Sequence, residues 1–365
     1  MEATHRNLKE YLKRLVRSTI FWTMAMLLFS VFRYYALKNE IGISIDDNYK
    51  DFYQLKDSLF NFAFGGFLIG VLYTTIEFLI DKFFAKNNSL VFVILLEIAL
   101  TFIGIIIVSS LVLSWWVKNK NIPYVVEFGW WYKDNSFIPA LIYIGMSIII
   151  YSLITIVFEK FGKGVFFKML IGSYKKPKET KRVFMFLDLK SSTTIAERLG
   201  HHQYSQFIQD FFYDLNEIVA SYEAEIYQYI GDEAVLNWSY KKGVYKNNCL
   251  NLFYAFKKKI QSKSKFYLEK YEVIPEFKVG IHGGTLMVAE VGVVKKELAY
   301  HGDVINTTAR VQAKCSEYCV SILITKNLLN DLDIEDYFED ALVAKTILKG
   351  KEKPVELYTL REIEL

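Results

Sequence analysis

Four long apolar stretches before residue 160 constrain this chain more than any other feature. Two carry no charge, whereas the first is interrupted by Arg33 and the third contains Glu97. Each reaches the roughly 20 residues that a helix needs to cross the hydrocarbon core of a bilayer. A buried helical domain is the alternative, but apolar runs of this length would leave such helices without a wet face. We therefore predict four membrane-spanning helices, at about Ser18 to Leu37, Ser58 to Ile76, about Leu90 to Val117, and Asn135 to Phe158.

The distribution of Lys and Arg predicts how these helices are oriented. Fifteen lie in the N-terminal arm, the second loop and the segment after the fourth stretch, against six in the other two loops. By the positive-inside rule, the N-terminus and the C-terminal domain lie in the cytoplasm, as in a multi-pass protein of the inner (plasma) membrane. The first stretch is too long for a signal-peptide core, so we interpret it as an anchor. Glu77 and Glu97 are either functional intramembrane carboxylates or residues near the cytoplasmic interface, and we favour the interface.

The composition changes after the fourth stretch, and this change predicts the domain boundaries. Residues 1–17 form a cytoplasmic arm, 18–159 a transmembrane domain, 160–181 a basic linker and 182–365 a soluble domain. The basic run Lys175–Lys178 is either a solvated linker or a contact with anionic membrane lipid. The net charge of only +4 does not indicate a nucleic-acid-binding protein. Three cysteines are too few for a disulfide scaffold.

The soluble domain has the pattern of a globular α/β fold. We expect a buried strand over 182–188, a helix over 192–222, a hairpin over 225–238 and a long helix over 245–271. A second strand pair over 277–291 would turn at Gly283-Gly284, followed by a helix from Asp303 to about Cys315 and strands near Val320 and over 353–359. This β-α-β-β-α-β order predicts an α+β, ferredoxin-like domain with an antiparallel sheet and helices on one face.

Two carboxylates stand at positions where the predicted strands end. Asp188 closes the first strand and Asp232 lies in the hairpin turn, so paired strands would bring both to one edge of the sheet. Adjacent carboxylates favour a hard cation such as Mg²⁺ or Mn²⁺. Ser191, Ser192 and Thr193 follow at a helix start, where backbone N–H groups favour a phosphate. Alone, Asp232 could be only a turn residue and the Ser/Thr run only a helix cap.

In order and spacing, five segments between about Arg182 and Thr359 resemble the catalytic domain of the class III nucleotidyl cyclases. They are Phe184–Thr193, Tyr229–Asp232, Val279–Gly284, Gly302–Arg310 and Leu348–Lys351. The resemblance implies an enzyme that converts ATP to 3′,5′-cyclic AMP and pyrophosphate. It implies that Asp188, Asp232 and the carbonyl of Leu189 hold two Mg²⁺ or Mn²⁺ ions per site. Asn306 would orient the ribose, Arg310 would neutralise charge on the phosphorus, and Lys351 or Lys349 would bind the terminal phosphates.

The resemblance also implies a homodimer, because each active site of this family spans two catalytic domains and only one is present here. Base recognition departs from the family pattern. Gln228 and Ala299 stand where adenine-specific members usually have a Lys and an Asp. ATP remains the favoured nucleoside triphosphate as the commonest substrate of the family. The alternatives are a guanylate or pyrimidine nucleotide cyclase, or a catalytically silent membrane receptor with a cyclase-like domain.

Overall fold

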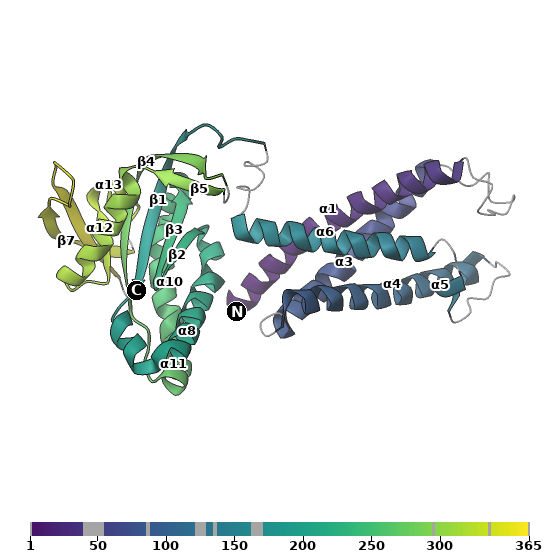
Figure 1. The fold of residues 1–365 in the computed structure, drawn as a ribbon, viewed down its shortest axis with the longest axis horizontal. Helices are drawn as coiled ribbons and strands as arrows, with labels where there is room; N and C mark the ends of the chain where they lie inside the picture. The colour runs from purple at the N-terminus through teal and green to yellow at the C-terminus, as the bar shows by residue number, and fades with distance from the viewer. Residues whose placement is uncertain are drawn as a thin grey trace. The chain divides into compact units, whose positions relative to one another are not determined.

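The computed structural model describes residues 2–38, 55–84, 88–120, 129–133, 137–161, 171–293, 296–334 and 337–363. The chain divides into two compact units, Met1–Lys160 and Phe161–Leu365. Residues 162–170 of the predicted linker (160–181) lie outside the described residues. Strand β1 (Lys178–Leu189) begins before the predicted boundary at Arg182. The prediction of long apolar helices followed by an α/β domain is confirmed (Figure 1).

The first unit is built of helices α1 (Glu2–Lys38), α3 (Leu55–Phe83), α4 (Leu90–Lys120), α5 (Trp130–Lys133) and α6 (Phe137–Phe161). Four of them contain a stretch long and apolar enough to cross a membrane, over Tyr11–Tyr35, Leu59–Asp81, Leu90–Leu111 and Ile138–Val157. Helices α1 and α3 approach closely where α3 carries glycines: a Cβ added at Gly66 would lie 2.6 Å from the backbone oxygen of Trp22. Small residues permit such contacts between membrane helices.

The second unit is built on an eight-stranded sheet in the order β2-β3-β1-β4-β6-β8-β7, with β5 paired to β4. The prediction of an antiparallel sheet needs one correction: strand β4 runs parallel to β6, whereas the other pairs among the described strands are antiparallel. After β1, the strands are β2 (Glu225–Ile230), β3 (Glu233–Ser239), β4 (Phe277–Val291), β5 (Glu297–His301), β6 (Ile322–Thr325), β7 (Phe338–Thr346) and β8 (Val355–Glu362). The predicted β2–β3 hairpin is confirmed, whereas β5 and β7 were not predicted.

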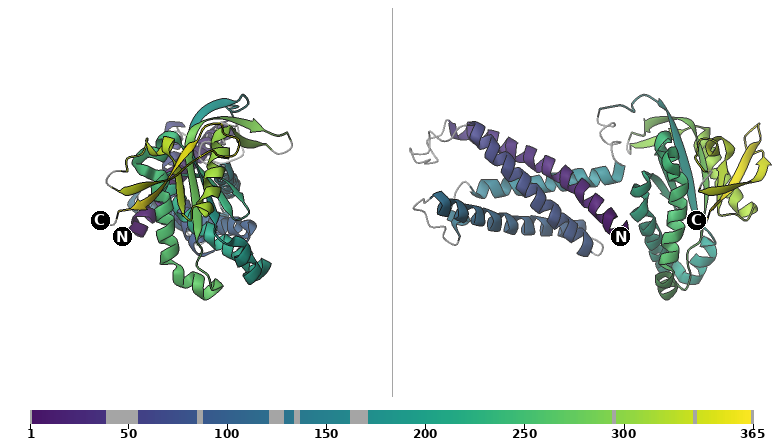
Figure 2. Two further views of the ribbon diagram at one scale, coloured as in Figure 1. Left: turned by 90° about the vertical axis from the view of Figure 1, so that its left-hand side faces the viewer. Right: turned by 180° about the vertical axis from the view of Figure 1, so that it is seen from behind.

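Helices cover both faces of this sheet, so the prediction of helices on one face is wrong (Figures 1 and 2). Alternate residues of β1 supply the two faces. Val183, Met185 and Leu187 join the larger apolar core, which also contains residues of α8 (Ser192–Val219), α10 (Asn248–Ser262) and α11 (Ser264–Tyr271). Phe184 and Phe186 join the smaller core on the other face, to which α12 (Asp303–Glu317) contributes.

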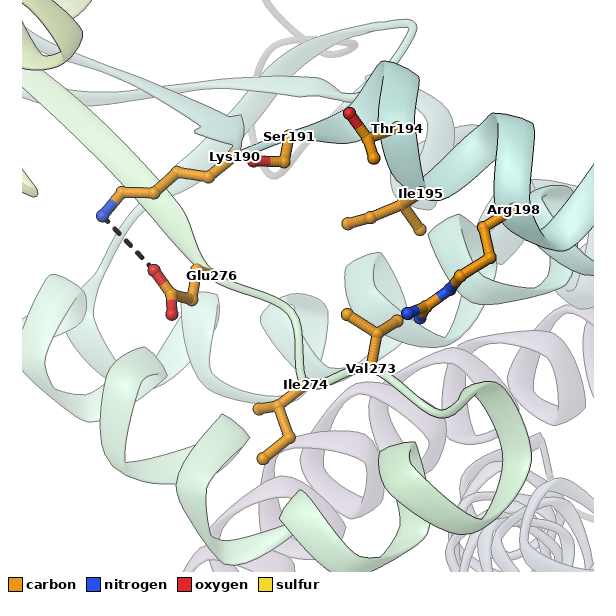
Figure 3. Close-up of a pocket in the computed structure, with 8 residues that line it drawn as sticks. All are labelled: Lys190, Ser191, Thr194, Ile195, Arg198, Val273, Ile274 and Glu276. Atoms are coloured by element: carbon orange, nitrogen blue, oxygen red, sulfur yellow. Dashed lines mark ion pairs between the residues drawn. The ribbon is translucent and has the colours of Figure 1, made fainter.

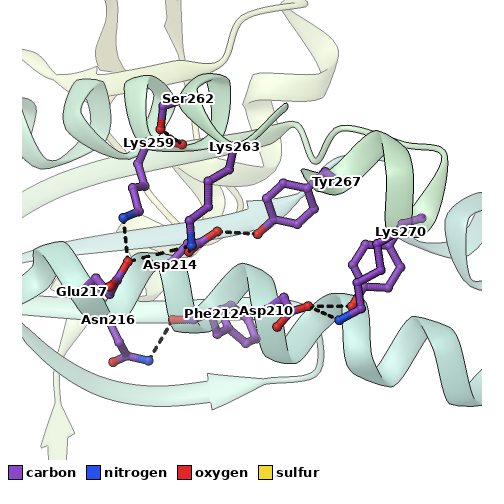
Figure 4. A network of polar contacts seen from close by, with 11 residues as sticks. Asp210, Phe212, Asp214, Asn216, Glu217, Lys259, Ser262, Lys263, Tyr267 and Lys270 are labelled. Carbon is purple, nitrogen blue, oxygen red and sulfur yellow. Dashed lines mark hydrogen bonds and ion pairs between the residues drawn. The ribbon is translucent and has the colours of Figure 1, made fainter. Parts of the chain in front are cut away.

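Two further expectations are corrected. Gly283 and Gly284 form no turn, because β4 is one continuous strand from Phe277 to Val291. The predicted long helix from 245 to 271 is broken, since α10 ends at Ser262 and α11 begins at Ser264. At the break, Lys263 leaves the helical backbone conformation and its ammonium pairs with the buried Asp214 of α8, which also accepts a hydrogen bond from Tyr267 (Figure 4).

Candidate active site

The first cluster of polar groups forms a row across three neighbouring strands. Asp188 on β1 lies opposite Glu233 on β3 and opposite Lys278 on β4. Cross-strand partners share a face of the sheet, so all three side chains lie on the face that carries α12. The Lys278 ammonium is 3.1 Å from Oδ2 of Asp188, and Gln312 of α12 donates a hydrogen bond to the same oxygen at 3.0 Å.

Asp232 adds a second acidic side chain at this edge. It follows Gly231, whose φ of +63° suits a glycine in the tight turn between β2 and β3. Burial and then the negative charges of Asp188 and Asp232 raise the pKa of Glu233 to about 7. Burial, followed by the charge of Asp232 and more weakly that of Asp188, also raises the pKa of Tyr204. Since Asp188 lies opposite Glu233, the residue directly after Asp232, both aspartates stand at the same edge of the sheet.

These residues fit a divalent cation by charge and by ligand chemistry. Asp188 lies opposite Glu233, and Glu233 directly follows Asp232, so three acidic residues stand at this edge, and a bound cation would offset their negative charge. The available donors are carboxylate oxygens and the backbone carbonyl of Leu189, the hard ligands that Mg²⁺ and Mn²⁺ prefer. Within the described residues, no three His, Cys, Asp or Glu side chains gather as a ready-made metal cluster.

The residues predicted to receive the triphosphate lie at the start of α8: Ser191 immediately precedes the helix, and Ser192 and Thr193 are its first two residues. Ser191 takes up a left-handed conformation with φ of 56°, and α8 then begins at Ser192. A cavity of about 330 Å³ opens beside this turn and is lined by Ser191 but not by Ser192 or Thr193 (Figure 3). Lys190 borders the same cavity, and its ammonium is 3.5 Å from the carboxylate of Glu276.

A second polar cluster surrounds the first half of α12. Asn306 is exposed, Arg310 is half-buried, and they lie one helical turn apart on the same side of the helix. A Cβ added at Gly350 would lie 3.5 Å from both terminal nitrogens of the Arg310 guanidinium. The structure thus brings together Arg310 and the turn that precedes Lys351.

The predicted phosphate-binding lysines differ in their surroundings. The Lys351 ammonium forms an ion pair with Asp303, whereas Lys349 is exposed. Burial raises the pKa of Asp303, but the hydrogen bond and charge of Lys351 outweigh burial and leave that pKa below its usual value. His282 of β4 bonds to Thr325 at 2.7 Å. Burial, together with the positive charge of Lys351, lowers the pKa of His282 to about 4.

The two predicted base-recognition residues lie on different strands. Gln228 is an exposed residue of β2 opposite Val235, and Ala299 is a half-buried residue of β5 opposite Ala289. Their neighbours Tyr227 and Tyr300 pack ring to ring, with centroids 5.0 Å apart.

Sequence reasoning missed Lys278, Gln312 and Glu233. Glu233 follows Asp232 directly, and Gln312 comes two residues after Arg310, so their positions beside predicted site residues were the available signal. At 100° per residue, Gln312 lies about 160° around the helix from Arg310. Since Gln312 faces Asp188 of its own chain, Asn306 and Arg310 point away from that aspartate.

Comparison with known proteins identifies the class that this fold and these clusters define. Residues 174–362 match the family model described as the adenylate and guanylate cyclase catalytic domain. The match covers more than half of the chain, which therefore belongs to this family.

Two curated relatives are adenylate cyclases from bacteria. Adenylate cyclase 2 of Rhizobium meliloti (strain 1021) is 33% identical over 208 residues, covering 55% of this chain and 56% of the relative. The adenylate cyclase of Anabaena cylindrica is 23% identical over 192 residues, covering 50% and 37%. The chain thus matches only about half, or less, of the length of these relatives.

Two solved structures resemble the chain. A bacterial light-regulated adenylyl cyclase is 14% identical, with 58% of this chain and 61% of that chain covered and a TM-score of 0.50. The adenylyl cyclase CyaB from P. aeruginosa is 18% identical, with 52% and 97% covered and a TM-score of 0.46. At these identities the likeness concerns the fold alone.

Proposed function

We propose that this chain is a membrane-anchored adenylate cyclase that converts ATP to 3′,5′-cyclic AMP and pyrophosphate. The observation that carries the proposal is the presence of two polar clusters of opposite charge on the second unit (Phe161–Leu365), which we call the catalytic unit. One is the acidic edge formed by Asp188 and Asp232, and the other is the basic group of Arg310 and Lys351 beside α12. The names of the curated relatives favour ATP as the substrate.

The acidic edge would hold the divalent ions. Asp188, Asp232 and the carbonyl of Leu189 would bind two Mg²⁺ or Mn²⁺ ions, which when bound supply Lewis-acid polarisation of the ribose 3′-hydroxyl and of the phosphates. Lys278 and Gln312 hold Oδ2 of Asp188, so this carboxylate is oriented before a ligand binds. Backbone N–H groups at Ser191, Ser192 and Thr193 would receive the triphosphate at the start of α8.

The basic cluster would come from a second chain, since Asn306 and Arg310 face away from Asp188 of their own chain. Asn306 would orient the ribose, and Arg310 would offset the charge that develops on the α-phosphate. The Lys351 ammonium would leave Asp303 and bind the terminal phosphates, with Lys349 as the alternative. A symmetric head-to-tail homodimer would carry two equivalent sites.

Base selection is assigned to Gln228, whose amide both donates and accepts and so matches the edge of adenine. Ala299 offers no side-chain polarity, so the usual Lys and Asp pair is replaced by a single amide. The four apolar helices would anchor the enzyme in the cell's inner (plasma) membrane, with the catalytic unit in the cytoplasm. The basic residues around Lys175 and Lys176 would contact anionic lipid.

Purified full-length protein supplied with Mn²⁺ and each of ATP, GTP, CTP and UTP in turn tests this proposal. We expect cyclic AMP as the main product and no product from an Asp232→Asn variant. Cyclic GMP or a cyclic pyrimidine nucleotide as the main product would keep the chemistry and change the substrate. If no triphosphate gives a cyclic product, the proposal that this chain is an enzyme is refuted, and the alternative of a catalytically silent receptor with a cyclase-like domain is favoured.

A further inference from the structure

Two membrane-capable helices each bury one carboxylate. Glu77 lies in the apolar stretch of α3 and Glu97 in that of α4, and their side chains are only 6% and 5% exposed. Ionised side chains are costly inside a membrane bundle and persist there when they pair with other groups or serve a function. The contacts of these two residues therefore decide what they do.

The two carboxylates have unequal partners. Oε2 of Glu97 accepts hydrogen bonds from the Tyr73 hydroxyl at 2.9 Å and from the Ser152 hydroxyl at 3.4 Å. Oε1 of Glu77 is 4.0 Å from the Arg17 guanidinium, whereas its Oε2 is buried and makes no hydrogen bond within the described residues. Arg17 also donates to the Tyr151 hydroxyl at 3.1 Å. These contacts join α1, α3, α4 and α6.

The charges at this junction do not balance. Among the described side chains, α1 contributes Arg14 and Arg17, α3 contributes Tyr73, Glu77 and Asp81, α4 contributes Glu97, and α6 contributes Tyr151. Arg14 and Asp81 form an ion pair of their own. With all three carboxylates ionised, Glu77, Asp81 and Glu97 face the two positive charges of Arg14 and Arg17, which leaves one negative charge uncompensated. One small monovalent cation would neutralise this charge, whereas a divalent ion would leave one positive charge in excess.

A second observation points to a ligand at the same place. Within the described residues of this unit, the buried side-chain atoms without a hydrogen-bond partner are Trp22 Nε1, Glu77 Oε2, Thr101 Oγ1 and Thr155 Oγ1. The Trp22 ring packs on Tyr73 with centroids 5.6 Å apart. Thr101 lies one turn beyond Glu97, and Thr155 one turn beyond Tyr151. Each unused threonine hydroxyl thus lies within one helical turn of a residue of this junction, and Oε2 of Glu77 is itself an unused carboxylate oxygen. Oxygens of these kinds bind hard cations.

We propose that the bundle of α1, α3, α4 and α6 holds a site for one small monovalent cation between Glu77 and Glu97. The proton and the alkali ions Na⁺ and K⁺ share the required charge and small size. The site lies within the first unit and goes beyond the proposed cyclase activity.

The test uses the full-length protein in lipid nanodiscs, with thermal unfolding followed by the helical circular dichroism signal. In the first arm, Na⁺ or K⁺ replaces the bulky cation N-methyl-D-glucamine at constant ionic strength and pH. In the second arm, the pH is lowered in N-methyl-D-glucamine alone. An ion at ten times its dissociation constant raises the folding equilibrium constant roughly 11-fold. We expect one arm to stabilise the wild-type protein in this way, and the responding arm identifies the ion.

Three variants make the test specific to the site. Glu97→Gln keeps an acceptor for Tyr73 and Ser152 but balances the charge, so the stabilisation seen for the wild-type protein in the responding arm should vanish. Glu77→Gln provides the same test on α3. Arg17→Gln increases the uncompensated charge and should strengthen the response. Glu269→Gln removes an exposed carboxylate of the catalytic unit and should respond like the wild type. A wild-type protein that responds in neither arm, or glutamine variants that respond like it, would overturn the proposal.

Discussion

The buried ion pair between Asp214 and Lys263 should be a main source of stability in the catalytic unit. The Asp214 side chain is 1% exposed, and it accepts hydrogen bonds from Lys263 and from the buried Tyr267 hydroxyl (Figure 4). Asp214→Ala would leave the Tyr267 hydroxyl without an acceptor, at about 1–3 kcal/mol. Breaking a fully buried ion pair costs about 3–5 kcal/mol. Lys263 is 35% exposed and keeps Glu217 at 4.0 Å, so we expect a total of about 3 kcal/mol.

Hydrogen exchange of the full-length protein measures this loss where it occurs. At about 1.4 kcal/mol per decade, peptides from α8 and α10 should exchange about 150-fold faster in Asp214→Ala. Asp214→Asn keeps an acceptor for Tyr267 and loses only the charge, so it should cost about 1 kcal/mol. Tyr267→Phe should cost a similar amount, and combining it with Asp214→Ala should add little, because the two residues share one interaction. Unchanged α8 exchange in Asp214→Ala would refute this account of how α8 is held to α10 and α11.

Three further predictions concern the site. Asp188→Ala and Arg310→Ala chains should each be inactive alone, but randomly mixed chains should regain up to about a quarter of wild-type activity, because one site of each heterodimer keeps both residues. Mixed dimers that stay inactive would show that the sites do not span chains. Gln228→Ala should lower kcat/KM for ATP by about 5- to 150-fold, at about 1–3 kcal/mol for unpaired base atoms; unchanged ratios among the four triphosphates would place base recognition elsewhere. His282 has a pKa of about 4 in the folded protein, below its unfolded value of about 6.5. The unfolded state therefore takes up the proton first as the pH falls, and up to about 3 kcal/mol of stability should be lost between pH 6.5 and 4. Urea unfolding of His282→Asn should show a smaller loss over this range, and an equal loss would contradict the assignment.

Local patterns in the sequence were sufficient to predict the four long apolar helices and the acidic edge. An uncharged run of about 20 residues has few alternatives to a membrane helix. Asp188 and Asp232 could be placed together because a strand end and a hairpin turn are local features, and a hairpin fixes which strand ends meet. These predictions needed no knowledge of how distant segments pack.

The remaining site contacts depend on packing between distant segments. Lys278 and Gln312 reach Asp188 through strand register and helix placement, which no local pattern fixes. The Gly283-Gly284 pair was misread for the same reason. A Cβ at Gly283 would lie 2.7 Å from the Tyr240 ring, and one at Gly284 would lie 2.9 Å from Val304. The two glycines allow other segments to pack closely on both faces of β4. In the sequence alone, a glycine pair needed for close packing looks the same as a glycine pair that forms a turn.

Helix α12 contacts Asp188 of its own chain through Gln312. In the proposed homodimer, Asn306 and Arg310 of the same helix would act at the Asp188 of the second chain, so one chain alone would carry only part of each site. The packing of α12 against β4 is close, since a Cβ at Gly280 would lie 2.3 Å from the backbone nitrogen of Gln312. This contact fixes the helix rotation that brings Gln312 to Asp188. The same rotation turns Asn306 and Arg310 outward by helical geometry. Gly280→Ala should therefore displace α12 and weaken both the hydrogen bond from Gln312 to Asp188 and the placement of Asn306 and Arg310. Arg310→Ala should leave the hydrogen bond from Gln312 to Asp188 intact. A Gly280→Ala chain that complements Asp188→Ala as fully as wild-type chains do would refute this coupling.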